Sequence, residues 1–252
     1  MKFAVVTPMI EETLVKNLEK IEHFVLMASA KNADFIIFPE AVLTGLINTD
    51  EPEHDFQLAL EKDSLEIQKL QQIAFKENIA IAFGYFEKVN HTLYDSFMCI
   101  SSVGKIIANY RRISLGWHDN HADKSIYLQG NDIYTFIIKS CSFTCLICGD
   151  LFDENLIDRI NKTNSDYLLV PFARAIEIKS NYEDFWEKEE FPFYIKQCNK
   201  SGKHTILTNY ISPIDEDKYQ YVGGAYLLSK EGEILHSQKL LTEGILYFTH
   251  NA

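Results

Sequence analysis

Cys148 ends a short apolar run and is followed at once by a glycine and acidic residues, in the segment LICGDLFDEN (residues 146–155). A thiolate is a strong nucleophile toward carbonyl carbon, so a cysteine in this position could attack an amide. Cysteine is also among the most buried residue types and can simply fill a core. The residue type alone leaves both interpretations open.

Two other polar features also follow predicted strands. Glu40 comes directly after FIIF, in FPEAVLTG, and Arg111 and Arg112 follow IIANY, in YRRISLGW. Layered α/β proteins usually build their sites where strands end. Each feature also has a structural explanation, because a carboxylate can cap a turn and an arginine pair can form a solvated, salt-bridged face.

Taken together, the order and context of these segments resemble the nitrilase superfamily, the carbon–nitrogen hydrolases. In that family a glutamate follows a strand in a pattern like FPE, a lysine lies in YRKxHL, and a cysteine ends a strand in ICxDxxxPE. The corresponding residues here are Glu40 in IIFPEAVLTG, Arg112 in YRRISL and Cys148 in ICGDLFDE. Further similarity lies in residues 84–110, 125–136, 166–174 and 221–235, so it covers nearly the whole chain.

The resemblance implies an α/β fold, a four-layer αββα sandwich with two mixed β-sheets, usually assembled as a homodimer or higher homo-oligomer. It also implies an amidase-like hydrolase, without cofactor or metal, that cleaves a non-peptide C–N bond of a small amide or carbamoyl compound through a cysteine thioester. Two alternatives stay open: an acyltransferase that uses the same three residues, and a catalytically impaired nitrilase-fold binding or assembly protein.

Physical chemistry explains why such a reaction needs these residue types. Reference pKa values of about 4.3 for glutamate and about 8.5 for cysteine make proton transfer between them uphill by about 6 kcal/mol in water. Burial raises the pKa of the carboxyl, and a fixed cation lowers that of the thiol. We therefore expect Cys148 to be the nucleophile, Glu40 the base and acid, and Arg112 the electrostatic stabiliser. The backbone N–H of Gly149 would help to hold the oxyanion.

Two positions depart from the family pattern. Arg112 stands where the family has lysine, and Ser114 replaces a histidine. Arginine keeps the positive charge but is larger and planar. Asp123, in ADKSIYLQG, falls on a second family glutamate that orients the lysine. A shorter acid beside a longer cation suggests a complementary pair of changes.

The substrate-binding residues are less well defined. Phe172, Ala173 and Arg174 follow the predicted strand YLLVP and are expected to approach the pocket. Arg174 could pair with a carboxylate on the substrate or with one of the protein's own acidic side chains, and the sequence does not separate these possibilities.

The elements that must position these residues alternate along the chain. Apolar patterning predicts helices at 14–25, 65–74 and 182–200, with a short helix after Asp153. Turn signals join several strands as hairpins, which favours a layered α/β protein with mixed sheets, and no linker divides the single domain, residues 1–252. The predicted strands are residues 3–7, 35–39, 79–84, 94–100, 106–110, 132–138, 143–148, 167–171, 204–209, 223–229 and 233–238.

Composition excludes several classes of partner and site. The net charge of −12, without a basic stripe, argues against nucleic acid and anionic membrane surfaces. Five cysteines and no export signal favour reduced thiols and a cytoplasmic location. On a strand Cys145 and Cys148 would face opposite sides, and the loop HDNHAD (residues 118–123) has no second ligand cluster, so no metal site is expected.

Overall fold

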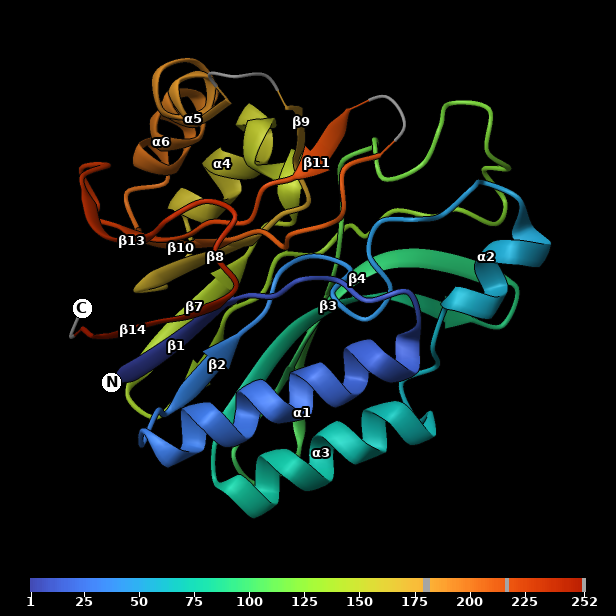
Figure 1. Ribbon diagram of the computed structural model, residues 1–252, viewed down its shortest axis with the longest axis horizontal. Coiled ribbons are helices and arrows are strands. Elements are labelled where there is room, and N and C mark those ends of the chain that lie inside the picture. The colour runs from blue at the N-terminus through green and yellow to red at the C-terminus, as the bar shows by residue number, and fades with distance from the viewer. Residues whose placement is uncertain (179–181, 216–217, 251–252) are drawn as a thin grey trace.

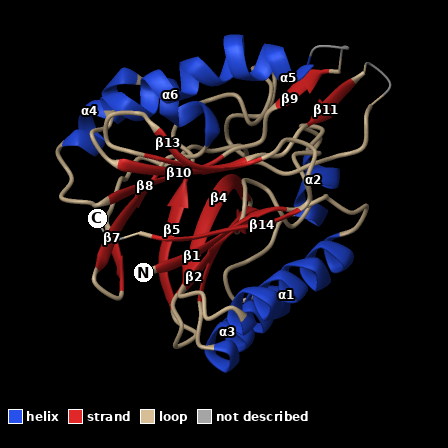
Figure 2. Ribbon diagram, turned by 60° about the vertical axis from the view of Figure 1, so that its left-hand side comes forward, coloured by secondary structure: helices blue, strands red, loops and turns tan. Residues whose placement is uncertain are grey.

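Two six-stranded mixed sheets pack face to face, and helices cover the outer face of each (Figures 1 and 2). This computed structural model describes residues 1–178, 182–215 and 218–250. The predicted αββα sandwich is therefore confirmed. The first sheet has the order β14(Gly244–Thr249), β1(Lys2–Thr7), β2(Phe35–Ile37), β3(Ala80–Val89), β4(Thr92–Ile100), β5(Ile106–Arg111). The second has the order β13(Ile234–Gln238), β12(Ala225–Leu228), β10(His204–Thr208), β8(Tyr167–Pro171), β7(Cys141–Cys145), β6(Phe136–Ile138).

The helices form the two outer layers. Helices α1(Leu14–Ala30) and α3(Leu65–Glu77) cover the first sheet, as the blue and teal ribbons of Figure 1 show. On the second sheet lie α4(Glu154–Asn161) and a continuous segment made of α5(Tyr182–Phe185), a π-helical turn (Trp186–Glu190) and α6(Phe191–Lys200). The remaining elements are α2(Pro52–Leu58), the small sheet of β9(Ala175–Glu177) and β11(Tyr219–Tyr221), and a 3-10 turn at Cys148–Phe152.

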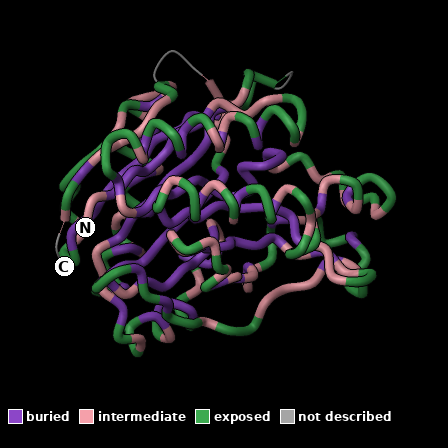
Figure 3. The backbone as a smooth tube through the Cα atoms, turned by 90° about the horizontal axis from the view of Figure 1, so that it is seen from below, coloured by how far each residue is buried: buried purple, intermediate pink, exposed green. Residues whose placement is uncertain are grey.

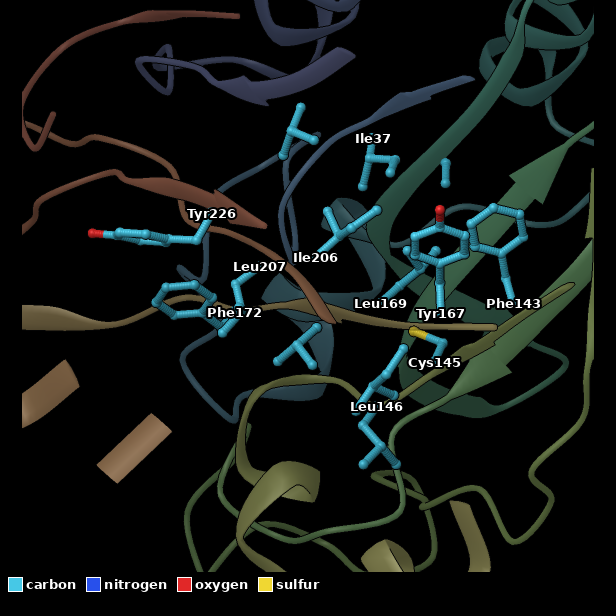
Figure 4. Close-up of a cluster of buried hydrophobic side chains, with 14 of the residues drawn as sticks. Ile37, Phe143, Cys145, Leu146, Tyr167, Leu169, Phe172, Ile206, Leu207 and Tyr226 are labelled. Atoms are coloured by element: carbon cyan, nitrogen blue, oxygen red, sulfur yellow. The ribbon is translucent and has the colours of Figure 1, made fainter. Parts of the chain in front are cut away.

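Strand alternation divides the core into an inner and an outer part. In β1, Phe3 and Val5 face the second sheet, whereas Ala4 and Val6 face the helices α1 and α3. Between the sheets, Phe143 stacks on Tyr167 with ring centroids 5.2 Å apart, and the two rings lie side by side in Figure 4. Figure 3 shows the buried strands running through the interior, with the exposed segments on the outer helices and loops.

Several elements differ from the sequence-based predictions. Only Phe136–Ile138 of the expected strand 132–138 is a strand, and β7 ends at Cys145 rather than at Cys148. Helix α2 and strands β9, β11 and β14 are not among the elements predicted from the sequence. Strand β14 (GILYFT) is a half-exposed edge strand with a continuous apolar run, and it pairs with β1 along its whole length. Among the described residues, no helix has the length and apolar character needed to cross a membrane.

We expect Phe143→Ala to destabilise the protein by about 3–5 kcal/mol, because it removes a fully buried ring from the contact between the sheets. Urea unfolding measures this effect. Phe75→Ala is the matched control, since Phe75 is 68% exposed on α3, and its effect should stay below about 1 kcal/mol. Equal losses in the two variants would contradict this view of the core.

Candidate active site

Cys148 lies on a sharp turn between a strand and a helical segment. Its φ of +45° is in the left-handed region, which costs free energy for a residue other than glycine. A strand-to-helix turn of this kind holds a nucleophile away from the sheet. All five cysteines lie in the described ranges; four are buried, and Cys148 is the one that is partly exposed. Its Sγ lies 4.0 Å from the carbonyl oxygen of Ala173.

A buried carboxylate, Asp150, holds this turn against the first sheet. Its oxygens accept hydrogen bonds from the backbone N–H of Ile147 at 3.1 Å and from the hydroxyl of Tyr110 at 2.6 Å. They also accept from the backbone N–H groups of Ile113 and Ser114, at 3.0 and 2.6 Å. Asp150 therefore joins the cysteine turn to the segment that follows β5.

The two adjacent arginines at the end of β5 point in opposite directions, as strand alternation requires. Arg111 forms hydrogen bonds of 2.8 and 2.9 Å with Glu87 and stacks on the ring of Tyr94. Arg112 points between the sheets and is only 4% exposed. Of the pair, Arg112 alone contacts the candidate catalytic groups.

Each of the three nitrogens of the Arg112 guanidinium donates a hydrogen bond. Nη1 donates to Glu40 Oε1 at 2.9 Å, and Nε donates to Ser114 Oγ at 3.1 Å. Nη2 donates to the backbone carbonyl of Leu115 at 3.3 Å. Ser114, where the family pattern has histidine, thus leaves room for the arginine and hydrogen-bonds to it.

Glu40 lies in a tight turn after β2 and is completely buried. This turn crosses β3 at Gly84, where an added Cβ would lie 2.4 Å from the backbone N of Ala41. Burial raises the pKa of Glu40 to about 8, and negative charge on the Cys148 sulfur adds to the rise, while Arg112 opposes it. Glu40 is therefore a carboxyl that can both take and return a proton near neutral pH.

A second buried carboxyl, which the sequence analysis missed, completes the cluster. Asp95 lies in β4, is 1% exposed, and has one oxygen 3.5 Å from Arg112 Nη1. Its pKa is raised well above the usual range, first by burial and then by Glu40. A signal for it was available, because Asp95 has the same strand parity as Phe97 and Cys99, which face the inter-sheet core.

Two of the predicted binding residues lie directly at this cluster. An added Cβ at Gly149 would be 2.6 Å from Arg112 Nη2 and 3.1 Å from Ser114 Oγ, so only glycine fits beside the guanidinium. Ala173 contributes its backbone carbonyl near the thiol.

Three other predicted residues are arranged differently. Phe172 is completely buried and stacks on Trp186, so its side chain belongs to the core. Arg174 donates to Glu190 at 2.7 Å, which is the salt-bridge alternative. The expected pairing of Asp123 with Arg112 is wrong: Asp123 is exposed and accepts from Ser125, because it caps a loop turn. Among the described residues, no group of three or more His, Cys, Asp or Glu side chains could hold a metal ion.

Comparison with known proteins gives a consistent result. The family model described as carbon-nitrogen hydrolase matches residues 2–251. A carbon-nitrogen hydrolase from Helicobacter pylori has a TM-score of 0.85 at 15% identity, covering 98% of this chain and 88% of that one. An amidase from Nesterenkonia sp. has a TM-score of 0.78 at 16% identity, and the match covers 98% of this chain and 89% of the amidase chain. The citrullinase of Francisella tularensis is 22% identical over 98% of this chain and 88% of its own length.

Three other curated relatives match over a smaller part of their length. The matched segment spans 38%, 33% and 32% of these proteins. The similarity to these relatives therefore concerns one part of each.

The raised pKa of Glu40 predicts a pH-dependent effect of Glu40→Gln on stability. An acid whose pKa rises on folding, here from 4.5 to about 8, destabilises the folded state increasingly as the pH climbs between those values. Glutamine cannot ionise, so the variant should be more stable than wild type by roughly 1–3 kcal/mol at pH 8 and about equally stable at pH 4.5. Calorimetry at both pH values measures this. The exposed Glu19→Gln is the control, and a pH-independent gain at Glu40 would contradict the raised pKa.

A second prediction concerns the contact between Gly149 and Arg112. Gly149→Ala should displace the guanidinium and slow the alkylation of Cys148 at pH 7 by about tenfold or more, since the cation stabilises the thiolate. The test is a double-mutant cycle with Arg112→Lys, whose side chain lacks the colliding group. An equal effect of Gly149→Ala in both backgrounds would show that the contact is unimportant.

Proposed function

The chain belongs to the carbon-nitrogen hydrolase family, and from this we propose that it is a cysteine hydrolase. It cleaves the non-peptide C–N bond of a small amide or carbamoyl compound through a thioester intermediate. One observation carries the proposal: the partly exposed Cys148 thiol lies on a strained turn against Glu40 and Arg112, which are buried and paired at 2.9 Å.

Acylation begins with transfer of the Cys148 proton to Glu40. The sulfur then attacks the substrate carbonyl carbon, and the carbonyl π electrons move to the oxygen. Arg112 and the backbone N–H of Gly149 stabilise this oxyanion, because both groups lie beside the thiol. When the C–N bond breaks, Glu40 gives its proton to the departing nitrogen, leaving a thioester and a free amine or ammonia.

Deacylation uses the same groups in the same order. Glu40, now a carboxylate, takes a proton from a water molecule whose oxygen attacks the thioester carbon. Collapse of the second oxyanion breaks the C–S bond, and the proton held by Glu40 returns to the sulfur. The carboxylic acid product leaves, and Cys148 and Glu40 are restored. A pKa near 8 suits Glu40 to both directions of transfer.

Arginine at position 112 is compatible with this chemistry. One guanidinium nitrogen donates a hydrogen bond to Glu40, and the other two donate to Ser114 and Leu115 in the segment after β5. The non-catalytic alternative is less favoured, because it gives no reason for Cys148, Glu40 and a buried cation to be retained together.

The remainder of the substrate would extend toward Arg174. A cavity of about 420 Å³ is lined there by Arg174, Ala175, Ile176, Glu177, Tyr182, Phe185 and Tyr219. Arg174 already pairs with Glu190, so this end of the site presents a cation and an anion together. A small amide or carbamoyl compound with a polar or zwitterionic end suits these surroundings.

A homo-oligomer is also part of the proposal. Phe193, which is 65% exposed, and Phe152, which is 41% exposed, belong to segments on the helical side of the second sheet. Pairing of two copies through this layer would remove both rings from water.

The experiment that tests the function is alkylation of Cys148 followed by mass mapping, across a range of pH, in wild type, Glu40→Gln and Arg112→Ala. We expect rapid labelling near pH 7 that slows by about tenfold or more in each variant, because each loses part of the system that forms the thiolate. Buried Cys99 and Cys145, whose thiol pKa values are raised by burial, are internal controls.

Ammonia release from a panel of small amides and carbamoyl compounds then identifies the substrate. Cys148→Ser should abolish that release. Labelling of Cys148 at the rate of a buried thiol in all three proteins would contradict the hydrolase and favour a binding protein with this fold.

A further inference from the structure

Asp95 is a buried acid that the reaction described above does not use. It is completely enclosed between the sheets, and neither of its carboxyl oxygens accepts a hydrogen bond from a described donor. The backbone N–H of Arg112 donates to its main-chain carbonyl at 2.8 Å, so the two residues lie side by side on β4 and the end of β5. A carboxylate in this position without donors would be very costly.

Glu40 also has a carboxyl oxygen that lacks a hydrogen-bond donor among the described residues. Its Oε1 accepts from Arg112, but its Oε2 is also buried without a described donor. The two carboxyls are neighbours, because the same Arg112 Nη1 lies 2.9 Å from Glu40 Oε1 and 3.5 Å from Asp95 Oδ2. A proton on Asp95 would satisfy one oxygen of each residue at once, because a carboxylic acid donates where a carboxylate cannot.

Charge balance leads to the same arrangement. Arg112 contributes one positive charge, whereas Glu40 and Asp95 together contribute two negative charges if both ionise. The other titratable groups near Asp95 are the acid Asp150 and the thiols of Cys145 and Cys148, none of which adds a positive charge. Burial without a second cation therefore favours one proton on the pair.

We infer that Asp95 is a carboxylic acid in the reactive form of the site, in which Glu40 is ionised, and that it acts as a positioning residue by donating a hydrogen bond to Glu40. Arg112 and the Asp95 hydroxyl then hold the Glu40 carboxylate from two sides. When Glu40 takes the Cys148 proton, Asp95 keeps its own, and Arg112 becomes the counterion of the thiolate. The cluster stays neutral through the transfer, because one proton has only moved from sulfur to oxygen.

The inference rests on the proposed function only for its activity readout, so the decisive test is spectroscopic. Infrared difference spectra at pH 9, where Glu40 is ionised, of wild type minus Asp95→Asn should contain the C=O band of a protonated carboxyl. The band should be lost in Glu40→Gln as well, because Asp95 is then the carboxyl of the pair that balances Arg112. The control Tyr94→Phe alters the neighbouring residue on β4, whose side chain points to the opposite face, and should retain the band.

Kinetic measurements on the same proteins give a second readout. Asp95→Ala should slow the alkylation of Cys148 by about 10- to 100-fold, the effect of losing one hydrogen bond to a charged group. The acidic limb of its pH profile should move to higher pH, because the donor that lowers the pKa of Glu40 is gone. Asp95→Asn should recover most of the loss, since its amide can still donate.

Two results would overturn the inference. One is the absence from wild type of any carboxyl band that Asp95→Asn removes. The other is an asparagine variant that labels as slowly as the alanine variant, which would mean that Asp95 acts as an anion. Both readouts apply even if no amide is hydrolysed, so failure of the proposed function would leave this test intact.

Discussion

A single buried guanidinium has to balance the charges of the whole site. Arg112 lies between two enclosed carboxyls, Glu40 and Asp95, and beside the cysteine turn. Arg174, which also acts on Cys148, is already paired with Glu190. Negative charge in the site is therefore limited to about one unit at any stage of a reaction. This limit ties the protonation of Glu40 to the ionisation of Cys148, so the acid and the nucleophile behave as one unit.

Arg112 can balance these charges only if the two sheets pack closely enough to bring it beside Cys148. The cysteine turn belongs to the second sheet, whereas Arg112 and Glu40 follow strands of the first, so the site exists only where the two sheets meet. Gly149 permits the approach of the cysteine turn to Arg112, and Gly84 lets the Glu40 turn cross β3 within the first sheet. An added Cβ at either glycine would lie within 2.6 Å of a neighbouring atom. Asp150 then fixes the distance between the sheets with hydrogen bonds to both sides.

Site residues at the ends of strands were predicted from the sequence, whereas those inside strands or in loops were not. Cys148, Glu40 and Arg112 follow apolar runs in an order that resembles the carbon-nitrogen hydrolases, and this resemblance implied both the fold and their roles. Asp95 was missed because it lies inside a strand, where a carboxylate is not expected. Asp123 was chosen because it falls on a second glutamate of the family pattern, but it lies in a loop, and loop geometry, unlike strand parity, does not follow from a short periodic pattern. The packing at both glycines depends on contacts between distant segments, which only the structure shows.

The distance along the chain between the partners has a consequence for protein synthesis. The ion pair joins residues 72 positions apart, and the bonds from Ile113 and Ser114 to Asp150 span 37 and 36 positions. Contacts of this range form late, after both sheets have docked. While the chain leaves the ribosome, Cys148 therefore lacks the groups that favour its thiolate. It then reacts only as fast as an ordinary thiol. Reactivity is acquired with the last tertiary contacts, so the newly made protein becomes chemically competent only once it is fully folded.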